Sequence, residues 1–301
     1  MKNKDAHKIG VFFVYVLIKL EKIRCYAKHN TLFLFVLGCE NYFEMKGLYV
    51  ILIFVRRLVM RVDVIGTSCT WFTRNNTSYV IDGDIILDTP EGSYKSIIQA
   101  MDMEKTRCIF ISHLHTDHWL DLHIFTTQTM RFPGSRTEKL RIYAPKGTLD
   151  SLIKLNEICI GAPDELDKEC VQKWVEFIDL YDGMEIVEGE YNIKVYKMEH
   201  GDPETYGFAF KDKNGMVVGF PTDTTVCDNL HKILKQSKYA FLELSAIKPH
   251  PKHINIDQFV ELSETYKNTK IFVVHTNDKT QKYAEENGFN TLHDMQVLNL
   301  E

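Results

Sequence analysis

The sequence lacks the cysteine pattern of a disulfide-rich domain or a cysteine-based zinc site. Its seven cysteines are odd in number, scattered, and never spaced Cys-x-x-Cys. They are Cys25, Cys39, Cys69, Cys108, Cys159, Cys170 and Cys227. Disulfide frameworks and structural zinc sites both need paired, closely spaced cysteines. We therefore expect a reducing compartment, the cytoplasm, and no metal site built from thiolates.

Long apolar runs are also missing. Three short apolar segments, at residues 9–20, 31–39 and 48–59, are separated by charged residues. Each is shorter than the roughly 20 residues of an ordinary membrane span. Lysines precede the first segment as in a signal peptide, but charged residues stand where a small-residue cleavage site would follow. We expect residues 1–59 to be a non-native extension before a domain at 60–301. The alternative is a membrane-surface segment, and only then would the chain contact a membrane.

Positive charge is scarce in the body of the chain. Residues 1–59 hold ten Lys and Arg against four Asp and Glu, and the whole chain has a formal net charge of −5. Residues 60–301 therefore carry about −11. Because general affinity for nucleic acid depends on basic side chains that neutralise phosphates, this acidic body is a poor binder of polyanions. Any phosphate recognition must be local.

The densest group of chemically active residues is one short stretch. An apolar run at 109–111 leads into Ser112-His113-Leu114-His115-Thr116-Asp117-His118, with three histidines and an aspartate. The run predicts a buried strand, with the ligands on the loop at its end. Imidazole and carboxylate together suit zinc, iron or manganese. Because the first two histidines can point one way while the last two ligands begin a turn, the stretch favours two metals over one. The alternative is a solvated loop with chance histidines.

Three further ligand candidates each follow an apolar strand directly. His200 precedes Gly201, Asp223 stands between two threonines, and His275 is followed by a Thr-Asn-Asp run. A lone histidine at a strand end is more often a hydrogen-bonded surface residue, but the cluster still needs partners for two metals. We therefore predict that His200, Asp223 and His275 complete the site. Open sheets bind their ligands at such strand ends.

The periodicity from residue 60 onward alternates between strands and helices. It predicts strands at 62–67, 79–82, 85–88, 107–111, 140–144, 174–180, 191–198, 206–210, 216–220, 240–244, 271–274 and 297–300. It predicts helices at 94–103, 118–130, 147–158, 226–236, 257–266 and 280–287, and it leaves 161–173 ambiguous. Two strand-rich halves with helices outside favour an α+β fold, a four-layer αββα sandwich.

Taken together, these motifs resemble the metallo-β-lactamase superfamily. The resemblance rests on His-x-His-x-Asp-His after a strand, a later lone histidine, a Thr-Asp-Thr turn and a last strand-end histidine, and it spans residue 60 to the end. It implies an αββα sandwich with two divalent metal ions, which we expect to be Zn²⁺, with Mn²⁺ and Fe²⁺ as alternatives. The implied ligands are His113, His115 and His200 for one metal, Asp117, His118 and His275 for the other, and Asp223 as the bridge.

Within the superfamily, the chain is most similar to RNase Z, the tRNA 3′-processing endonucleases, and related phosphodiesterases. Residues 74–78, residues 88–93, and His200 followed by Tyr206-Gly207-Phe208 resemble stretches of that group. His253 matches the position of its additional non-ligand histidine, and Glu243 resembles the acid that supports this histidine. The resemblance therefore implies Asp117, His253 and Glu243 as catalytic residues.

Two features depart from the RNase Z pattern. RNase Z carries its tRNA-binding arm between the third histidine and the bridging aspartate, whereas a single predicted hairpin joins His200 to Asp223 here. After His118 the chain has Trp119-Leu120-Asp121-Leu122 instead of a Gly-Leu-Pro-Gly type run. With the acidic body, these departures argue against structured tRNA. We expect a small-molecule or short phosphodiester substrate, and we consider a homodimer alongside a monomer.

The chemistry expected at such a site is hydrolysis by a metal-bridging hydroxide, because two cations lower the pKa of bound water. Asp117 would orient the hydroxide and take its proton. His253, held by Glu243, would give a proton to the leaving oxygen or contact the phosphate. The alternative for His253 is an ordinary surface histidine in a loop. The nearest alternative is lactone, ester or thioester hydrolysis on the same metals. A non-catalytic metal-binding module is a further alternative. The oxygen-reducing di-iron branch of the superfamily fits least, because it has glutamate where His115 stands and works with a flavin domain.

Overall fold

The computed structural model describes residues 32–36, 50–54, 59–70, 72–161 and 168–301. The chain divides into two compact units, Met1–Arg57 and Leu58–Glu301. In the first unit, β1 (Leu32–Val36) and β2 (Val50–Phe54) pair as an antiparallel ribbon. The rest of the expected extension lies outside the described residues. Among the residues that the structure describes, no helix has the length and apolar character needed to cross a bilayer.

The second unit contains two seven-stranded mixed sheets. The first has the order β16-β3-β4-β5-β6-β7-β8, and its strands from β5 to β8 are parallel. Its strands are β3 (Met60–Gly66), β4 (Ser78–Ile81), β5 (Ile85–Leu87), β6 (Cys108–Phe110), β7 (Leu140–Ala144), β8 (Val175–Asp179) and β16 (Gln296–Leu300).

The second sheet has the order β15-β14-β13-β12-β11-β10-β9, and its strands from β12 to β15 are parallel. Its strands are β9 (Glu185–Glu188), β10 (Tyr191–Met198), β11 (Thr205–Lys211), β12 (Val217–Thr222), β13 (Tyr239–Glu243), β14 (Lys270–Val274) and β15 (Asn290–Thr291).

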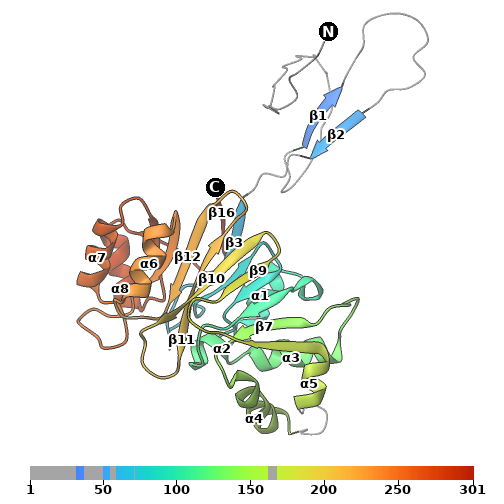
Figure 1. Cartoon of the computed structure of the whole chain (residues 1–301). Coiled ribbons are helices and arrows are strands. Elements are labelled where there is room, and N and C mark those ends of the chain that lie inside the picture. The colour runs from blue at the N-terminus through green and yellow to red at the C-terminus, as the bar shows by residue number, and fades with distance from the viewer. Residues whose placement is uncertain (1–31, 37–49, 55–58, 71, 162–167) are drawn as a thin grey trace, which may run out of the picture. The chain divides into compact units, whose positions relative to one another are not determined.

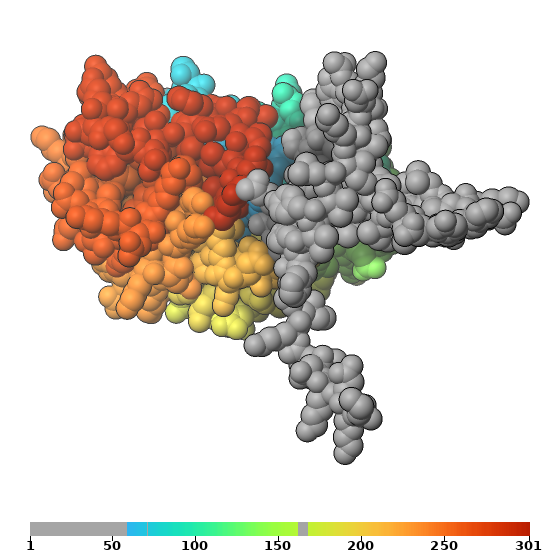
Figure 2. Space-filling view, turned by 90° about the horizontal axis from the view of Figure 1, so that it is seen from above, coloured from blue at the N-terminus to red at the C-terminus, as the bar shows by residue number. Residues whose placement is uncertain are grey.

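Helices cover the outer face of each sheet (Figure 1). Those on the first sheet are α1 (Tyr94–Ala100), α2 (Thr116–Trp119), α3 (Leu122–Arg131), α4 (Thr148–Ile160) and α5 (Lys168–Trp174), with a 3₁₀ turn at Met103–Lys105. Those on the second sheet are α6 (Asp228–Gln236), α7 (Ile256–Thr265) and α8 (Asp278–Glu286). Figure 2 shows these last segments, orange to red, gathered at one side of the domain. The result is a four-layer αββα sandwich.

Three apolar clusters fill the spaces between the four layers. The central cluster lies between the sheets and is rich in aromatic rings, among them Phe110, Phe208 and Phe220. A second cluster joins the first sheet to α1, α3, α4 and α5, and a third joins the other sheet to α6, α7 and α8. Strands that bury both faces in this way read as continuous apolar runs in the sequence, as β4, β5 and β6 do.

The predicted α+β sandwich is confirmed, and three local differences have physical reasons. The helix predicted at 118–130 is broken between α2 and α3, because Asp121 accepts a hydrogen bond from the Tyr94 amide and its own amide donates to Thr89 O. Strand β9 was not predicted, since its Glu-Ile-Val-Glu sequence alternates between exposed and buried residues over only four positions. The ambiguous segment contains α5.

The topology brings the ends of five strands to one edge of the sandwich. Strands β12, β13 and β14 are parallel to one another. Strand β10 runs in the same direction as β12, because β10 and β12 each pair antiparallel with β11. In the first sheet, β6 ends shortly before His113. Open α/β sheets bind ligands beyond the carboxyl ends of their strands. The fold therefore predicts the functional site at this edge.

The central layer gives a direct test of this packing. Phe110 is fully buried, stacks on Tyr143 with a centroid distance of 4.7 Å, and meets Phe208 edge-on at 5.3 Å. Phe110→Ala leaves a cavity, and we expect it to lower the free energy of unfolding by about 3–5 kcal/mol. Phe132→Ala, at a side chain that is 67% exposed, should change it by less than about 0.5 kcal/mol. Chemical denaturation measures both. Equal losses would contradict the central position of Phe110.

Candidate metal centre

Three histidines meet at the first part of the site. His113 Nε2 lies 3.0 Å from His115 Nδ1, and His200 Nε2 lies 3.2 Å from that same His115 atom. His113 follows β6, His115 begins α2, and His200 follows β10. His113 and His200 are buried, and His115 is half-buried. All three ligand atoms lie within 4.8 Å of one another.

A second group forms beside the first from Asp117, His118 and His275. His118 Nε2 lies 3.3 Å from His275 Nε2, and Asp117 Oδ2 lies 3.4 Å from His275 Nε2 and 3.9 Å from His118 Nε2. Asp117 and His118 are in α2, whereas His275 follows β14 on the other sheet. The three side chains are buried, and their ligand atoms also lie within 4.8 Å of one another.

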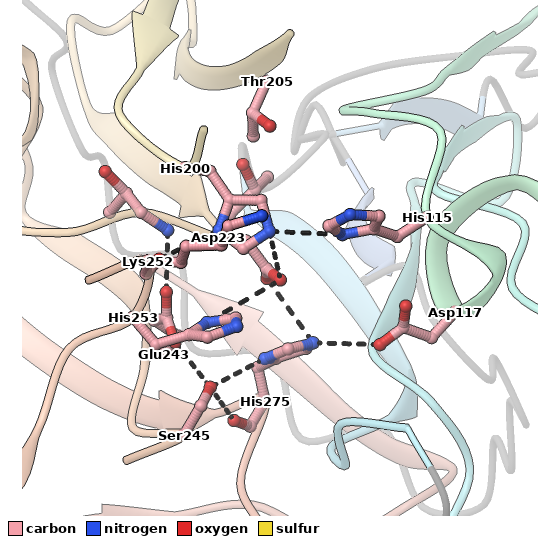
Figure 3. Close-up of polar contacts among 12 residues, drawn as sticks. His115, Asp117, His200, Thr205, Asp223, Glu243, Ser245, Lys252, His253 and His275 are labelled. Atoms are coloured by element: carbon pink, nitrogen blue, oxygen red, sulfur yellow. Dashed lines mark hydrogen bonds and ion pairs between the residues drawn. The ribbon is translucent and has the colours of Figure 1, made fainter. Parts of the chain in front are cut away.

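Asp223 stands between the two groups, directly after β12. Its Oδ2 lies 3.7 Å from His200 Nε2 and 3.9 Å from His113 Nε2. Its Oδ1 lies 3.5 Å from His118 Nε2 and 3.4 Å from His275 Nε2. Figure 3 shows the carboxylate between His200, His253 and His275. Each oxygen of one carboxylate thus faces a different ligand group.

These donors fit metal ions better than they fit each other. Asp223 is 2% exposed, and its Oδ1 accepts no hydrogen bond although two imidazole nitrogens point at it. A buried carboxylate oxygen without a partner is costly. Tetrahedral ligands about 2.0–2.1 Å from a zinc ion lie about 3.3–3.4 Å apart, and most of the separations in each group are close to that value. A cation bound by the group that contains His118 and His275 would give Asp223 Oδ1 the partner that it lacks.

The electrostatics of the site point the same way. Burial opposes ionisation of Asp223, but the charges of His275 and His118 outweigh it and hold the Asp223 pKa well below its usual range. Burial likewise opposes the charged form of His118, but Asp223 and Asp117 outweigh it and raise the His118 pKa well above its usual range. Burial and the neighbouring His118 lower the His113 pKa. The cluster therefore needs positive charge to balance its carboxylates, as a metal site does.

Asp88 orients His118 from behind. Asp88 Oδ2 lies 2.8 Å from His118 Nδ1, and the carboxylate also accepts hydrogen bonds from the Ser112 amide at 2.7 Å and the Ser112 hydroxyl at 2.8 Å. Asp88 follows β5 and has a left-handed backbone with φ of 62°. This contact fixes the tautomer of His118 so that Nε2 faces the site. Metal-binding histidines commonly donate their other nitrogen to such a partner.

The second sheet orients its two histidines in the same way. Ser245 Oγ lies 2.9 Å from His275 Nδ1, and the Lys252 carbonyl oxygen lies 2.9 Å from His200 Nδ1. Both contacts leave Nε2 free to face the site. Ser245 also donates to Glu243 Oε2 at 2.5 Å. The candidate metal ligands His200 and His275 are therefore held by hydrogen bonds on the side of the ring that faces away from the site.

His253 lies at the side of the site and is held by Glu243. Glu243 Oε2 lies 2.9 Å from His253 Nδ1, and Oε1 accepts a hydrogen bond from the Thr224 amide at 2.7 Å. Figure 3 shows His253 between Glu243 and Asp223. Burial lowers the pKa of His253, but Glu243 and Asp223 outweigh it and raise the pKa to about 9. Two bound cations would lower it again, because like charges disfavour the protonated form.

An open cavity of about 620 Å³ lies in front of these groups. Its lining includes residues of both ligand groups and His253, together with the apolar side chains of Phe72 and Leu114. This volume is within the range of about 300–1,000 Å³ that is typical of small-molecule sites. The cavity gives a substrate direct access to Asp117 and His253.

The structure brings all nine predicted site residues together at this edge. They are His113, His115, Asp117, His118, His200, Asp223, Glu243, His253 and His275. Asp88, Ser112 and Ser245 were not predicted as site residues. Their signal in the sequence is weak, since each is a common polar residue near a strand end, although Asp88 opens a stretch that resembles RNase Z. Among the described residues, His123, His231 and His293 belong to none of the ligand groups.

The chain is similar to proteins of known families. A family model described as "Anti-Pycsar protein Apyc1" matches residues 62–298, which include every residue of the site. The chain belongs to the Apyc1 family. It is also 35% identical over 154 residues to a ribonuclease Z of Methanosarcina mazei, a match that covers 48% of this chain and 46% of that protein. The chain thus spans about half the length of the curated relatives it matches.

Solved structures share the fold of this Apyc1-family chain. The metallo-β-lactamase fold protein YhfI from Bacillus subtilis aligns with a TM-score of 0.64 at 16% identity, over 80% of this chain and 99% of that chain. The short form of human tRNase Z aligns with a TM-score of 0.61 at 17% identity, over 80% of this chain and 100% of that chain. The predicted resemblance to RNase Z and to the metallo-β-lactamase fold is confirmed.

The contact between Asp88 and His118 generates a prediction. Asp88→Asn keeps the shape of the side chain but removes the carboxylate that fixes the His118 tautomer. We expect the affinity for metal at the group that contains His118 to fall about 10–100-fold. Competition against a chromophoric chelator measures this loss.

Asp121→Asn is the matched control, because Asp121 is also a buried aspartate but contacts the Tyr94 amide instead of a histidine. Its metal affinities should match those of the wild-type protein. Unchanged affinities in Asp88→Asn would contradict the orienting role of Asp88, and equal losses in both variants would reduce it to a general effect of buried charge.

Proposed function

We propose that this chain is a binuclear metal-dependent phosphodiesterase that hydrolyses small or unstructured phosphodiesters. The observation that carries the proposal is the position of Asp223, whose two oxygens face two separate ligand groups beside an open cavity. A second observation, the pair of His253 and Glu243 at the side of that cavity, supplies a proton donor. The position of Asp223 supports metal binding by these residues, and the pair of His253 and Glu243 supports hydrolysis.

The proposed metal ligands are the two groups described above. His113, His115 and His200 would hold one ion, Asp117, His118 and His275 the other, and Asp223 would bridge them. When bound, two such cations lower the pKa of a water between them, so that a hydroxide is available near neutral pH, and they neutralise charge on a phosphate. We expect Zn²⁺, and the same histidine and aspartate donors also suit Mn²⁺ and Fe²⁺.

Two groups of the chain would move the protons of hydrolysis. Asp117 lines the cavity, so its carboxylate is in position to orient the attacking water and accept its proton. The water oxygen bonds to phosphorus as the bond from phosphorus to the leaving oxygen breaks. His253 then gives a proton to that leaving oxygen. Because Glu243 binds His253 Nδ1, the Nε2 atom is free for this transfer.

The substrate we propose is small or unstructured, and structured tRNA is disfavoured. Residues 201–222 are all described and contain β11, β12 and their connecting turn, so no arm stands between His200 and Asp223. The acidic body offers little general attraction for a polyanion. The family model is described as an anti-Pycsar protein. We propose that this chain has the same role and performs it by hydrolysing a phosphodiester.

We also propose a domain boundary, a cellular location and two alternatives for the oligomeric state. The domain is proposed to begin at residue 60, with the preceding residues a non-native extension or a membrane-surface segment. The scattered cysteines support a cytoplasmic location. A homodimer stays an alternative to a monomer.

Substrate class separates the leading proposal from its rivals. Wild-type protein loaded with Zn²⁺ or Mn²⁺ should cleave bis(p-nitrophenyl) phosphate, and removal of the metal by a chelator should abolish that activity. A panel of lactones and thioesters forms the comparison. Hydrolysis of lactones with an inert phosphodiester would favour the ester hydrolase, whereas inertness of the metal-loaded protein toward every substrate would favour a non-catalytic metal-binding module.

The role of His253 is tested by changing the leaving group. A proton donor matters most when the leaving oxygen is a poor one. We therefore expect His253→Ala to lower kcat about 10²–10⁴-fold for a phosphodiester with an alkoxide leaving group. The loss should be much smaller for p-nitrophenolate, which leaves without protonation. Metal content, measured on the same samples, should stay at the wild-type level.

His250→Ala is the matched control for this prediction. His250 lies in the same loop, with its ring centroid 5.1 Å from that of His253, but it belongs to none of the ligand groups of the described residues. It should retain activity on both substrates. Equal losses for the two leaving groups in His253→Ala would refute proton donation and would point to a phosphate contact instead.

A further inference from the structure

The cavity in front of the metal ligands has an aromatic residue that the proposed mechanism does not use. Phe72 lines it together with Leu114, and Asp117, His253 and His275 belong to the same lining. The Phe72 side chain is 39% exposed, so part of it faces solvent. Aromatic rings beside a polar group commonly serve as contact surfaces for ligands.

Described residues on either side of Phe72 are hydrogen-bonded to the body of the domain. Asp294 accepts hydrogen bonds from the Thr67 amide at 3.1 Å, the Thr67 hydroxyl at 3.0 Å and the Asn75 amide at 2.6 Å. Arg74 donates to the Thr276 carbonyl oxygen at 3.0 Å, directly beside His275. Both ends of the segment are therefore fixed relative to a metal ligand.

Close backbone packing strengthens this attachment. A Cβ atom at Gly66 would lie 2.1 Å from the carbonyl oxygen of Asn76, so only glycine allows the two ends of the segment to approach this closely. Ser68 also bridges to both Asn76 and Thr276.

The charges along the cavity restrict what can lie against Phe72. Among the described residues that line the cavity there is no lysine or arginine, while Asp117 and Asp223 are present. A second phosphate, bound away from the metal ligands, would therefore have no lysine or arginine of this lining to pair with. An uncharged, flat group would instead replace water on the Phe72 ring, and stacking of aromatic groups of this kind is favourable.

From these observations we infer that Phe72 is a specificity-determining residue that contacts an uncharged aromatic substituent on the non-leaving side of the phosphodiester. This inference rests on the proposed function. The phosphate would sit at the metal ligands, the leaving oxygen beside His253, and the second ester group against Phe72 and Leu114. Phe72 thus selects the substrate without a part in the bond-breaking step.

Two substrates with the same leaving group separate selection from chemistry. Methyl p-nitrophenyl phosphate and phenyl p-nitrophenyl phosphate both release p-nitrophenolate and differ only in the non-leaving group. For the wild-type protein, we expect kcat/KM to be roughly tenfold higher for the phenyl ester than for the methyl ester. Phe72→Ala should remove this preference by raising KM for the phenyl ester, while kcat/KM for the methyl ester stays within about twofold.

Two further variants complete the test. Phe72→Tyr keeps the ring and should retain the preference for the phenyl ester. Phe132→Ala removes an exposed phenylalanine in the segment after α3 that does not line the cavity, and it should behave as wild type.

Each remaining outcome counts against one of the two proposals. Wild-type protein that cleaves both esters equally well would overturn the role of Phe72 and leave the proposed function standing. A Phe72→Ala variant that loses both substrates equally would show a structural role or a contact with the leaving group, and would also overturn the inference. Wild-type protein that cleaves neither ester, with metals bound, would overturn the proposed function and the inference with it.

Discussion

One buried carboxylate, that of Asp223, is the constraint on which the site depends. It faces imidazole nitrogens on two sides, and its Oδ1 has no hydrogen bond. A buried carboxylate oxygen without a hydrogen bond is expensive. Two residues beside the site, Thr222 and His275, also have left-handed backbones with φ of 59° and 48°. Strain of this kind costs about 1–3 kcal/mol per residue and gathers at functional sites. Bound cations would offset the buried charge.

The four-layer architecture explains how distant residues reach Asp223. His113 and His118 follow a strand of the first sheet, whereas His200 and His275 follow strands of the second. The aromatic layer between the sheets, with Phe110 and Phe220 fully buried, fixes the distance between these two sources of ligands. The site is therefore a property of how the sheets pack, and loss of that packing would separate its two halves.

Much of this arrangement is predictable from the sequence, for identifiable reasons. Apolar runs that end in a histidine or aspartate mark buried strands with ligands at their ends, and this pattern identified His113, His200 and His275. The supporting contacts are harder to find. Asp88 and Ser245 act through geometry that appears only when the strands are assembled, and Phe72 lies in a loop without periodicity. Strand β9 was missed because it is only four residues long and one of its two buried residues is Glu188, a charged side chain that pairs with Arg141 from the other sheet.

The most direct test of the account is a crystal structure of the metal-loaded protein, with the ions located by anomalous scattering. The account predicts two metal positions about 3.5–4 Å apart, with one Asp223 oxygen bound to each ion or a single oxygen shared between them. His113, His115 and His200 should surround one position, and Asp117, His118 and His275 the other. A single ion at full occupancy under saturating metal, or two ions of which only one touches Asp223, would contradict the binuclear site.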